Sequence, residues 1–328
     1  MLTRRTWLLG AAGALTASQL PLSRGAAAQV IQQTTRVVVP FPAGGSTDTL
    51  ARILADKLKG VYAPTTIVEN RVGAAGRLAV DYVKGAEADG SVILFTPDFP
   101  ITVYPHSFRS LNYDPVRDFT PVATIAKSAL CLSIGPSIPG SVKTLQDFLA
   151  WCKANPDKAT HATTAAGGTP HFAGLMLSQA SKVPMTPVHY KGGAPALQDL
   201  IGGHVSCGVN PVGEVLPFVK DGKVRVLAVT SANRSSFLPD VPTMKESGYD
   251  VVIEAWLGAL VPSKTPDDIV SKLNVAIKDA FAAPDVKQKL AVLGNEPDYK
   301  TPAEFAATVK ADIERWGPVV KASGFVAD

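Results

Sequence analysis

A short apolar strand, a glycine turn and a helical pattern occupy residues 36–50, and this segment constrains the fold more than any other. Three consecutive valines at positions 37–39 predict a short buried strand, because β-branched residues pack well on a pleated sheet. Gly44 and Gly45 permit a tight turn after it. Leucine and isoleucine then recur at the spacing of one helix face. The segment therefore predicts a strand that leads through a glycine loop into a helix.

The start of that helix is suited to an anion. The first N–H groups of a helix have no partner within the helix, and the helix dipole places partial positive charge there. Ser46, Thr47 and Asp48 are all residue types that cap helices. The segment alone leaves two interpretations open, an anion-binding turn and an ordinary strand-to-helix connection.

A second turn, at residues 188–197, repeats this arrangement far along the chain. A short strand pattern enters it, Gly192 and Gly193 turn the chain, and Leu197 and Leu200 begin a helical pattern. Open α/β sheets bind ligands at the carboxyl ends of their strands, where both turns would lie. We therefore expect one turn on each of two lobes, facing each other across a cleft. Neither turn contains arginine, so a bound carboxylate would be held largely by N–H groups, hydroxyl groups and water.

Apolar β-rich runs alternate with helical patterns along the chain. The runs lie at residues 37–39, 66–68, 92–95, 130–134 and 224–229. Such alternation is typical of α/β layers with mostly parallel strands. Helix starts are indicated by Thr301 with Glu304, which form a capping-box pattern, by Thr265 before a proline, and by Thr144.

Residues 1–28 have the features of a twin-arginine export signal. Arg4 and Arg5 precede a modest apolar run at residues 8–20, and alanines at 26–28 suit a cleavage site. We therefore expect cleavage after Ala28 and a periplasmic location. A retained membrane anchor is the alternative, and the short, interrupted apolar run counts against it.

Most of the net positive charge lies in that signal segment. Residues 1–28 hold three arginines and no acid, so the formal net charge of +4 falls to +1 without them. Nothing in the remaining composition indicates nucleic-acid binding. Cys131, Cys152 and Cys207 cannot all pair with one another. Export permits one disulfide, but we expect buried free thiols.

Searches for catalytic motifs are negative. The sequence has no G-x-S-x-G, Walker A, G-x-G-x-x-G or H-E-x-x-H pattern, and its five histidines show no metal-ligand spacing. We therefore expect no metal, no cofactor and no enzyme activity; a metal site assembled from distant positions is the alternative. Asp48 lacks a nearby acid–base partner, which favours a structural role or a water-bridged ligand contact. For His171, packing and ligand contact both stay open.

Several segments together resemble the periplasmic receptors of tripartite tricarboxylate transporters, also called the Bug family. The segments are Val-Pro-Phe-Pro-Ala-Gly-Gly-Ser-Thr-Asp at 39–48, Val-Glu-Asn-Arg-Val-Gly-Ala-Ala-Gly at 68–76, Ala-Asp-Gly at 88–90, Tyr-Lys-Gly-Gly-Ala-Pro at 190–195, Gly-Lys-Val-Arg-Val-Leu-Ala-Val-Thr at 222–230, Leu-Pro-Asp-Val-Pro-Thr at 238–243, Trp-Leu-Gly at 256–258 and Val-Pro at 261–262. They follow the family order and span almost all of the chain after residue 28.

The resemblance implies a type II periplasmic-binding-protein fold. This fold has two α/β lobes joined by a two-strand hinge, with a ligand cleft between them. The implied first lobe is discontinuous and comprises residues 29–126 and 231–328, and the second comprises residues 127–230. The two crossings are expected near residues 124–128 and 230–233.

The resemblance also implies the ligand site. In this family two turns clamp a ligand carboxylate, partly through ordered waters. These roles carry over to Phe41, Ala43, Gly44, Gly45, Ser46, Thr47 and Asp48 in the first turn, and to Tyr190, Lys191, Gly192, Gly193 and Ala194 in the second. Further pocket walls are implied at Thr96, Asp98, Gly168, Thr169, His171 and Asn210. Asp98 would disfavour a second carboxylate beside it unless it is protonated or turned away.

We therefore expect a monomeric solute-binding protein, not an enzyme. It would capture a small carboxylate by lobe closure and deliver it to the membrane subunits of a tripartite tricarboxylate transporter. A carboxylate-sensing receptor of a membrane signalling system is one alternative. An exported carboxylate-processing enzyme is another, and the missing nucleophile and base motifs count against it. The sequence leaves the identity of the carboxylate open.

Overall fold

The structure of the protein is a computed structural model that describes residues 29–328, so the expected signal peptide lies outside the described residues. The strands are β1 (Thr35–Val39), β2 (Thr66–Asn70), β3 (Val92–Pro97), β4 (Phe119–Ile134), β5 (Thr160–Thr163), β6 (Thr186–His189), β7 (Cys207–Pro211), β8 (Arg225–Val229), β9 (Glu254–Pro262) and β10 (Glu296–Lys300). Each β-rich run of the sequence forms a strand or part of one.

Helices cover these strands. They are α1 (Ser46–Leu58), α2 (Arg77–Lys84), α3 (Phe99–Thr102), α4 (Tyr104–Ser107), α5 (Leu145–Ala154), α6 (Thr169–Ser181), α7 (Gly193–Ile201), α8 (Val212–Lys220), α9 (Asp267–Ala282), α10 (Pro284–Val292) and α11 (Pro302–Ser323), with 3₁₀ turns η1 (Ala74–Gly76) and η2 (Pro156–Lys158). Thr301 begins α11 with the expected capping box, and Thr144 caps α5 as expected, where it also forms a capping box, with Asp147. Helix α9 begins one residue later than the Thr265 signal indicates, because Pro266 is its N-cap.

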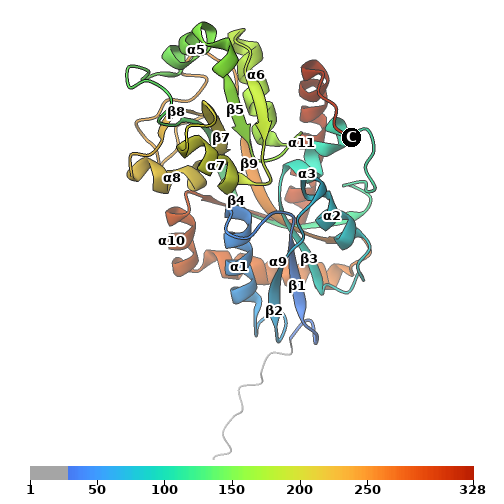
Figure 1. Ribbon diagram of the computed structural model, residues 1–328. Coiled ribbons are helices and arrows are strands. Elements are labelled where there is room, and N and C mark those ends of the chain that lie inside the picture. The colour runs from blue at the N-terminus through green and yellow to red at the C-terminus, as the bar shows by residue number, and fades with distance from the viewer. Residues whose placement is uncertain (1–28) are drawn as a thin grey trace, which may run out of the picture.

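The strands form two groups that share β4. In the first, the order is β2-β1-β3-β9-β4, with β10 also paired to β4. In the second, the order is β4-β7-β5-β6, with β8 also paired to β4. Figure 1 shows the first group below, with α1, α9 and α10, and the second above, with α5 to α8. This is the two-lobed α/β architecture that the sequence predicts.

The expectation of mostly parallel strands is correct only for three strands in each lobe. Strands β1, β2 and β3 are parallel to one another, and so are β5, β6 and β7. The pairs that involve β4 and β9 are antiparallel. The physical reason is that β4 carries the chain from one lobe into the other, and the returning β9 runs back beside it.

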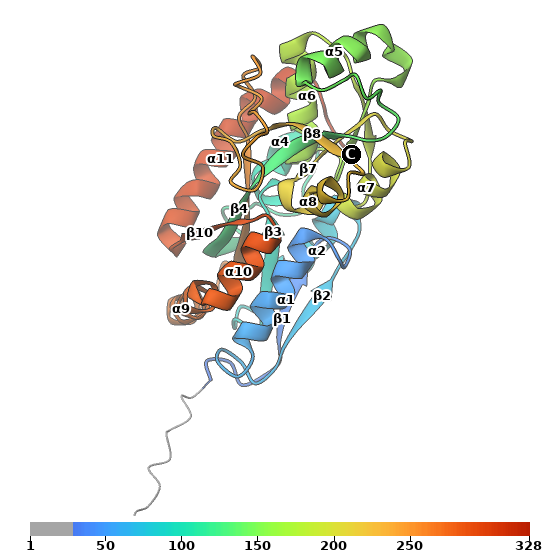
Figure 2. The ribbon, with the colours of Figure 1, turned by 90° about the vertical axis from the view of Figure 1, so that its left-hand side faces the viewer.

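Strand β4 is much longer than the apolar run at residues 130–134. It pairs with β9 up to Ala129 opposite Glu254, and with β7 from Leu130 opposite Pro211. Its first part contains Pro121 and register shifts, which disrupt the apolar pattern that marks a strand in sequence. The strand therefore passes directly between the two lobes. Helix α11 contacts β4, α3 and α6, and in Figure 2 it runs along the side of both lobes.

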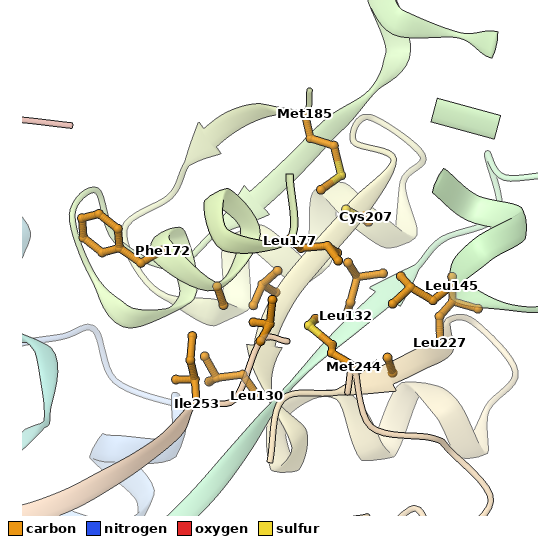
Figure 3. Close-up of a cluster of buried hydrophobic side chains, with 14 of the residues drawn as sticks. Leu130, Leu132, Leu145, Phe172, Leu177, Met185, Cys207, Leu227, Met244 and Ile253 are labelled. Atoms are coloured by element: carbon orange, nitrogen blue, oxygen red, sulfur yellow. The ribbon is translucent and has the colours of Figure 1, made fainter. Parts of the chain in front are cut away.

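The core of the second lobe fixes the position of the segment between β8 and β9. Figure 3 shows Leu130 and Leu132 of β4 beside Met244 and Ile253 of that segment, in one buried cluster. The lobe boundaries after residues 126 and 230 stay predictions. The packing of Met244 and Ile253 favours a second crossing closer to Glu254.

Two further expectations concern the described residues. All three cysteines are free and buried, as predicted, so the thiols serve packing. Over residues 29–328, the helices lack the combination of length and apolar character that crossing a bilayer requires.

Candidate functional site

The first glycine turn connects β1 to α1 and is held by Asp48. The carboxylate of Asp48 accepts a hydrogen bond of 3.0 Å from the Gly44 N–H and two of 2.9 Å from the Arg52 guanidinium. It also accepts one of 2.9 Å from the Asn70 amide, which in turn donates to the Phe41 carbonyl oxygen. Burial alone raises the pKa of Asp48, but these hydrogen bonds outweigh it and hold the pKa below its usual range.

This geometry assigns Asp48 a structural role in the turn. Its oxygens already accept four donors, and Gly44 has a φ of 91°, which glycine adopts at little cost. The residues expected to cap the helix do not do so. Gly45 is the N-cap of α1, which therefore begins without a side-chain cap from its own N-cap residue.

The second glycine turn connects β6 to α7. Gly192 has a φ of 112° and donates a backbone hydrogen bond of 2.9 Å to the Thr164 carbonyl oxygen. Gly193 begins α7, which also lacks a side-chain cap. The turn therefore provides a second helix start. No side-chain cap accepts a hydrogen bond from its first N–H groups.

Both turns line one cleft between the lobes. In Figure 1 the start of α7 lies above the start of α1. A Cβ atom built on Gly192 would lie 3.5 Å from the Pro42 ring, so the two turns nearly touch. The cleft is lined by these residues of the sequence prediction: Phe41, Ala43, Gly45, Ser46, Thr47, Asp48, Asp98, Thr169, Lys191, Gly192, Gly193 and Ala194.

Glu214, at the start of α8, places a carboxylate between the two helix starts. Its Oε1 accepts a long hydrogen bond of 3.4 Å from the Ser46 N–H, and its Oε2 accepts one of 3.4 Å from the Asn210 amide. A Cβ atom built on Gly193 would lie 1.7 Å from Oε2, so any side chain at this position would displace the Glu214 carboxylate. Burial raises the pKa of Glu214, and the hydrogen bonds offset this only in part. The two helix starts thus converge on one carboxylate.

Asp98 is a second acid in the cleft and follows β3. It is 1% exposed, and its Oδ2 accepts a 2.7 Å hydrogen bond from the Thr169 hydroxyl at the start of α6. Burial raises the pKa of Asp98 to about 7 against the opposing effect of this hydrogen bond. The contact joins a residue after β3 in the first lobe to a residue of the second lobe.

The other predicted site residues do not line the cleft. Gly44 lines a separate pocket next to the cleft. Thr96 is fully buried, and its hydroxyl donates a hydrogen bond to the Pro97 carbonyl oxygen. Gly168 packs against the Phe99 ring, and the Tyr190 hydroxyl donates to Asp199. The Asn210 amide donates a hydrogen bond to Glu214, and His171 lies in an aromatic cluster.

Several lining residues were missed by the sequence prediction. They include Ser128 and Leu130 of β4, Thr164 after β5, Glu214 of α8, Trp256 of β9 and Asn295 before β10. Glu214 had a signal that could have found it. It is an acid three residues after a buried strand, β7, in an otherwise apolar run, and the carboxyl end of such a strand is where α/β sheets bind ligands.

His171 belongs to a buried histidine cluster. Its ring centroid lies 6.1 Å from that of His161 and 4.7 Å from that of His189. Its Nδ1 accepts a hydrogen bond from the Gly167 N–H, and Phe325 packs edge-on against its ring. Burial, together with the neighbouring histidines, lowers the pKa of His161 to about 4 and of His171 to about 3. Both rings are therefore neutral in the folded protein at neutral pH.

This cluster predicts an acid-sensitive stability. Unfolded histidines take up protons below about pH 6.5, whereas His161 and His171 stay neutral in the fold until about pH 4 or lower. Their contribution is present above pH 6.5 and is lost as the pH falls from there toward 4. We expect each of these two histidines to lower the free energy of unfolding by about 1–2 kcal/mol when the pH falls from 7.5 to 5.

Thermal unfolding followed at both pH values measures this effect. His161→Leu removes one buried titrating ring and should reduce the fall in Tm between pH 7.5 and pH 5. His204→Gln, at an exposed position, is the matched control and should leave the fall unchanged. An equal fall in the wild type and in His161→Leu would contradict the assignment.

Within residues 29–328, no cluster of three or more histidine, cysteine, aspartate or glutamate side chains is arranged to hold a metal ion. The cleft offers instead two helix starts, one lysine, the acids Glu214 and Asp98, and a few hydrogen-bonding side chains. Such an arrangement can hold and orient an acid group without reacting with it.

Known proteins match this chain over most of its length. A family model described as "Tripartite tricarboxylate transporter family receptor" matches residues 50–325. Protein BugT of Bordetella pertussis is 32% identical over 291 residues, which cover 88% of this chain and 89% of BugT.

Solved structures match the fold closely. Rpa4515 of R. palustris with adipate has a TM-score of 0.85 at 32% identity and covers 89% of this chain and 98% of its own. MatC of Rhodopseudomonas palustris with bound malate has a TM-score of 0.82 at 33% identity and covers 88% of this chain and 98% of its own.

These matches confirm the expected fold class and the expectation of a receptor, not an enzyme, because the matched family is one of receptors. The family model alone covers well over half of the chain. The chain therefore belongs to the family of tripartite tricarboxylate transporter receptors.

Proposed function

We propose that this protein is a periplasmic solute-binding receptor that captures a small carboxylate in its interlobe cleft. One observation carries the proposal: the uncapped starts of α1 and α7, one from each lobe, converge on the carboxylate of Glu214. Helix starts bind anions through free N–H groups and the helix dipole. The place where they meet is therefore suited to an anion: Glu214 fills part of it through the Ser46 N–H, and the ligand carboxylate would bind beside Glu214 at the remaining N–H groups of the two helix starts.

The proposed clamp consists of the first turn, from Phe41 to Asp48, and the second turn, from Tyr190 to Ala194. Lys191 is the exposed cation at its edge. The adipate and malate bound to Rpa4515 and MatC support a carboxylate as the ligand class. Binding at an interlobe cleft would favour the closed arrangement of the lobes, because the ligand contacts both.

We further propose that residues 1–28 direct export by the twin-arginine route and are cleaved after Ala28. The receptor would act as a monomer and deliver its ligand to the membrane subunits of a tripartite tricarboxylate transporter. The role of the family as transporter receptors supports this partner. Purified membrane subunits should bind the ligand-loaded receptor more tightly than the empty receptor, and equal binding of both forms would contradict delivery by lobe closure.

A thermal-shift screen tests the carboxylate clamp. Small mono-, di- and tricarboxylic acids are compared with their methyl esters, which keep the carbon skeleton but carry a methyl group in place of each negative charge. A ligand at about 100 times its Kd stabilises the fold by about 2.7 kcal/mol and should raise Tm by about 5 °C. The esters should give no shift. Equal shifts from an acid and its ester, or no shift from any acid, would contradict the proposal.

A further inference from the structure

The carboxylate of Glu214 lies where the starts of α1 and α7 meet. Its Oε1 accepts the 3.4 Å hydrogen bond from the Ser46 N–H, and a Cβ atom built on Gly45 would lie 3.9 Å from the same oxygen. A Cβ atom built on Gly193 would lie 1.7 Å from Oε2. Glu214 belongs to α8, which contacts α7 in the second lobe, whereas Ser46 begins α1 in the first lobe (Figure 1). The carboxylate thus lies against both glycine turns and joins the two lobes.

This carboxylate is the same chemical group that the two helix starts are suited to bind. An ionised glutamate side chain and a ligand carboxylate both offer two acceptor oxygens and one negative charge. At a helix start, both gain from the N–H groups that lack a partner and from the helix dipole. Glu214 and a ligand carboxylate would therefore compete for the same donors.

The contacts that hold Glu214 in this position are weak. Its hydrogen bonds from the Ser46 N–H and the Asn210 amide are both 3.4 Å long. The ion pairs found over residues 29–328 do not include Glu214. Burial raises the pKa of Glu214, and the two hydrogen bonds offset this only in part. Glu214 therefore accepts a proton more readily than an exposed glutamate does.

The surroundings of Glu214 offer little positive charge. The charged and titratable groups on the elements around it and across the cleft are Asp48, Arg52, Asp98, Cys131, Lys191 and Asp199. Asp48 is bonded to Arg52, and Asp199 accepts a hydrogen bond from the Tyr190 hydroxyl. Burial raises the pKa of the Cys131 thiol, which is therefore neutral. Among the described residues that line the cleft, Lys191 is the one lysine or arginine. A second carboxylate beside an ionised Glu214 would thus be strongly repelled.

We infer that Glu214 is a built-in competitor of the ligand carboxylate, and that ligand binding is coupled to the uptake of one proton by Glu214. The inference rests on the proposed function and adds this proton to it. The proton comes from solvent, which reaches Glu214 because the residue lines the cleft and is only partly buried.

Proton uptake turns the competitor into a partner for the ligand. The uncharged carboxyl group no longer repels a ligand carboxylate at the same helix starts. One of its oxygens now carries an O–H group, which can donate a hydrogen bond to a ligand oxygen. In the ligand-free protein, the ionised side chain instead fills part of the anion position.

Calorimetry on the wild type and Glu214→Gln between pH 6.5 and 8.5 tests the inference. The probes are benzoate, malate, adipate and any other acid that stabilises the protein in the thermal-shift screen. Their carboxyl groups are ionised throughout this range. For a probe that binds, the wild-type Kd should rise by up to about tenfold per pH unit, because binding takes up a proton. Titrations at pH 8 in two buffers of different ionisation enthalpy should give an uptake of about one proton.

Glu214→Gln is the informative variant, because its amide keeps the size of the side chain and donates an N–H bond at every pH. Its Kd should be nearly independent of pH, its proton uptake should be lost, and at pH 8.5 it should bind the probe about tenfold more tightly than the wild type, or better. A residue with only a structural role would change Kd by the same factor at every pH.

Two further variants assign the proton. Asp98 is the other acid of the cleft, and Asp98→Asn should leave in place the proton uptake that Glu214→Gln abolishes. Glu314→Gln removes an exposed acid of α11 and should change neither Kd nor proton uptake. Proton uptake that disappears in Asp98→Asn and persists in Glu214→Gln would overturn the inference.

The remaining outcomes separate the inference from the proposed function. If the wild-type Kd does not change with pH, or if Glu214→Gln keeps the wild-type pH dependence, the inference is wrong and the carboxylate clamp stands. If no acid binds either the wild type or Glu214→Gln, the proposed function is wrong and the inference falls with it.

Discussion

Replacing Gly193 by aspartate is expected to reduce ligand affinity at least 100-fold. A Cβ atom at this position would lie 1.7 Å from Oε2 of Glu214, a separation that atoms do not adopt without displacement. The new carboxylate would also stand at the start of α7, beside Glu214 and in the proposed place of the ligand carboxylate. Both the steric overlap and the added negative charge oppose binding. Calorimetry with an acid that stabilises the wild-type protein measures the loss.

The control for this variant is Gly140→Asp. Gly140 is exposed and a Cβ atom there meets nothing within 4 Å, so the same change should leave affinity unaltered. The milder Gly193→Ala isolates the steric effect, and adding Glu214→Ala should restore part of the affinity by opening space. Circular dichroism of each variant would check that it is folded. Unchanged affinity in folded Gly193→Asp would exclude this turn as one side of the clamp.

Replacing Asp48 by alanine is expected to destabilise the fold by about 3 kcal/mol. The change leaves the Gly44 N–H and the Asn70 amide without their acceptor at a position that is 3% exposed. The Arg52 ion pair contributes less, because the Arg52 side chain is 55% exposed and regains water. Urea unfolding measures the loss of stability, which should appear as a lower midpoint with an unchanged slope.

Asp56→Ala is the matched control for Asp48→Ala. Asp56 lies on the same helix, α1, but is exposed, so its removal should change stability by less than about 0.5 kcal/mol. The Asp48 variant should also bind ligand more weakly, since the first turn loses its support. Equal stability of the two variants would contradict the role of Asp48 as the residue that holds the turn.

Local features of the fold could be predicted well from the sequence. The valine strand, the two glycine turns and the helix caps at Thr144 and Thr301 all formed where their patterns indicate. These features depend on residues within about four positions of one another, where spacing and backbone preference decide the conformation. The long strand β4 could not be predicted in full, because its first part gains stability from β9 and β10, which are remote in sequence.

The residues of the candidate site also fall into those that a local sequence pattern predicted and those that it did not. The residues of both turns were found because glycine turns have a clear sequence signature. Glu214 and Asn295 were missed, because their importance depends on contacts that no local pattern encodes. His171 and Asn210 lie behind the cleft surface, where burial by neighbouring strands and helices decided their positions.

The sequence by itself determined that this chain has two glycine turns that lead into helices, and it determined the receptor family. The tertiary structure alone decided that Glu214 lies between them. The hydrogen bond from the Ser46 N–H to Glu214 joins residues 168 positions apart. Whether an acid is paired or left without a cation depends on which distant groups the fold brings within reach, and burial then makes that difference large.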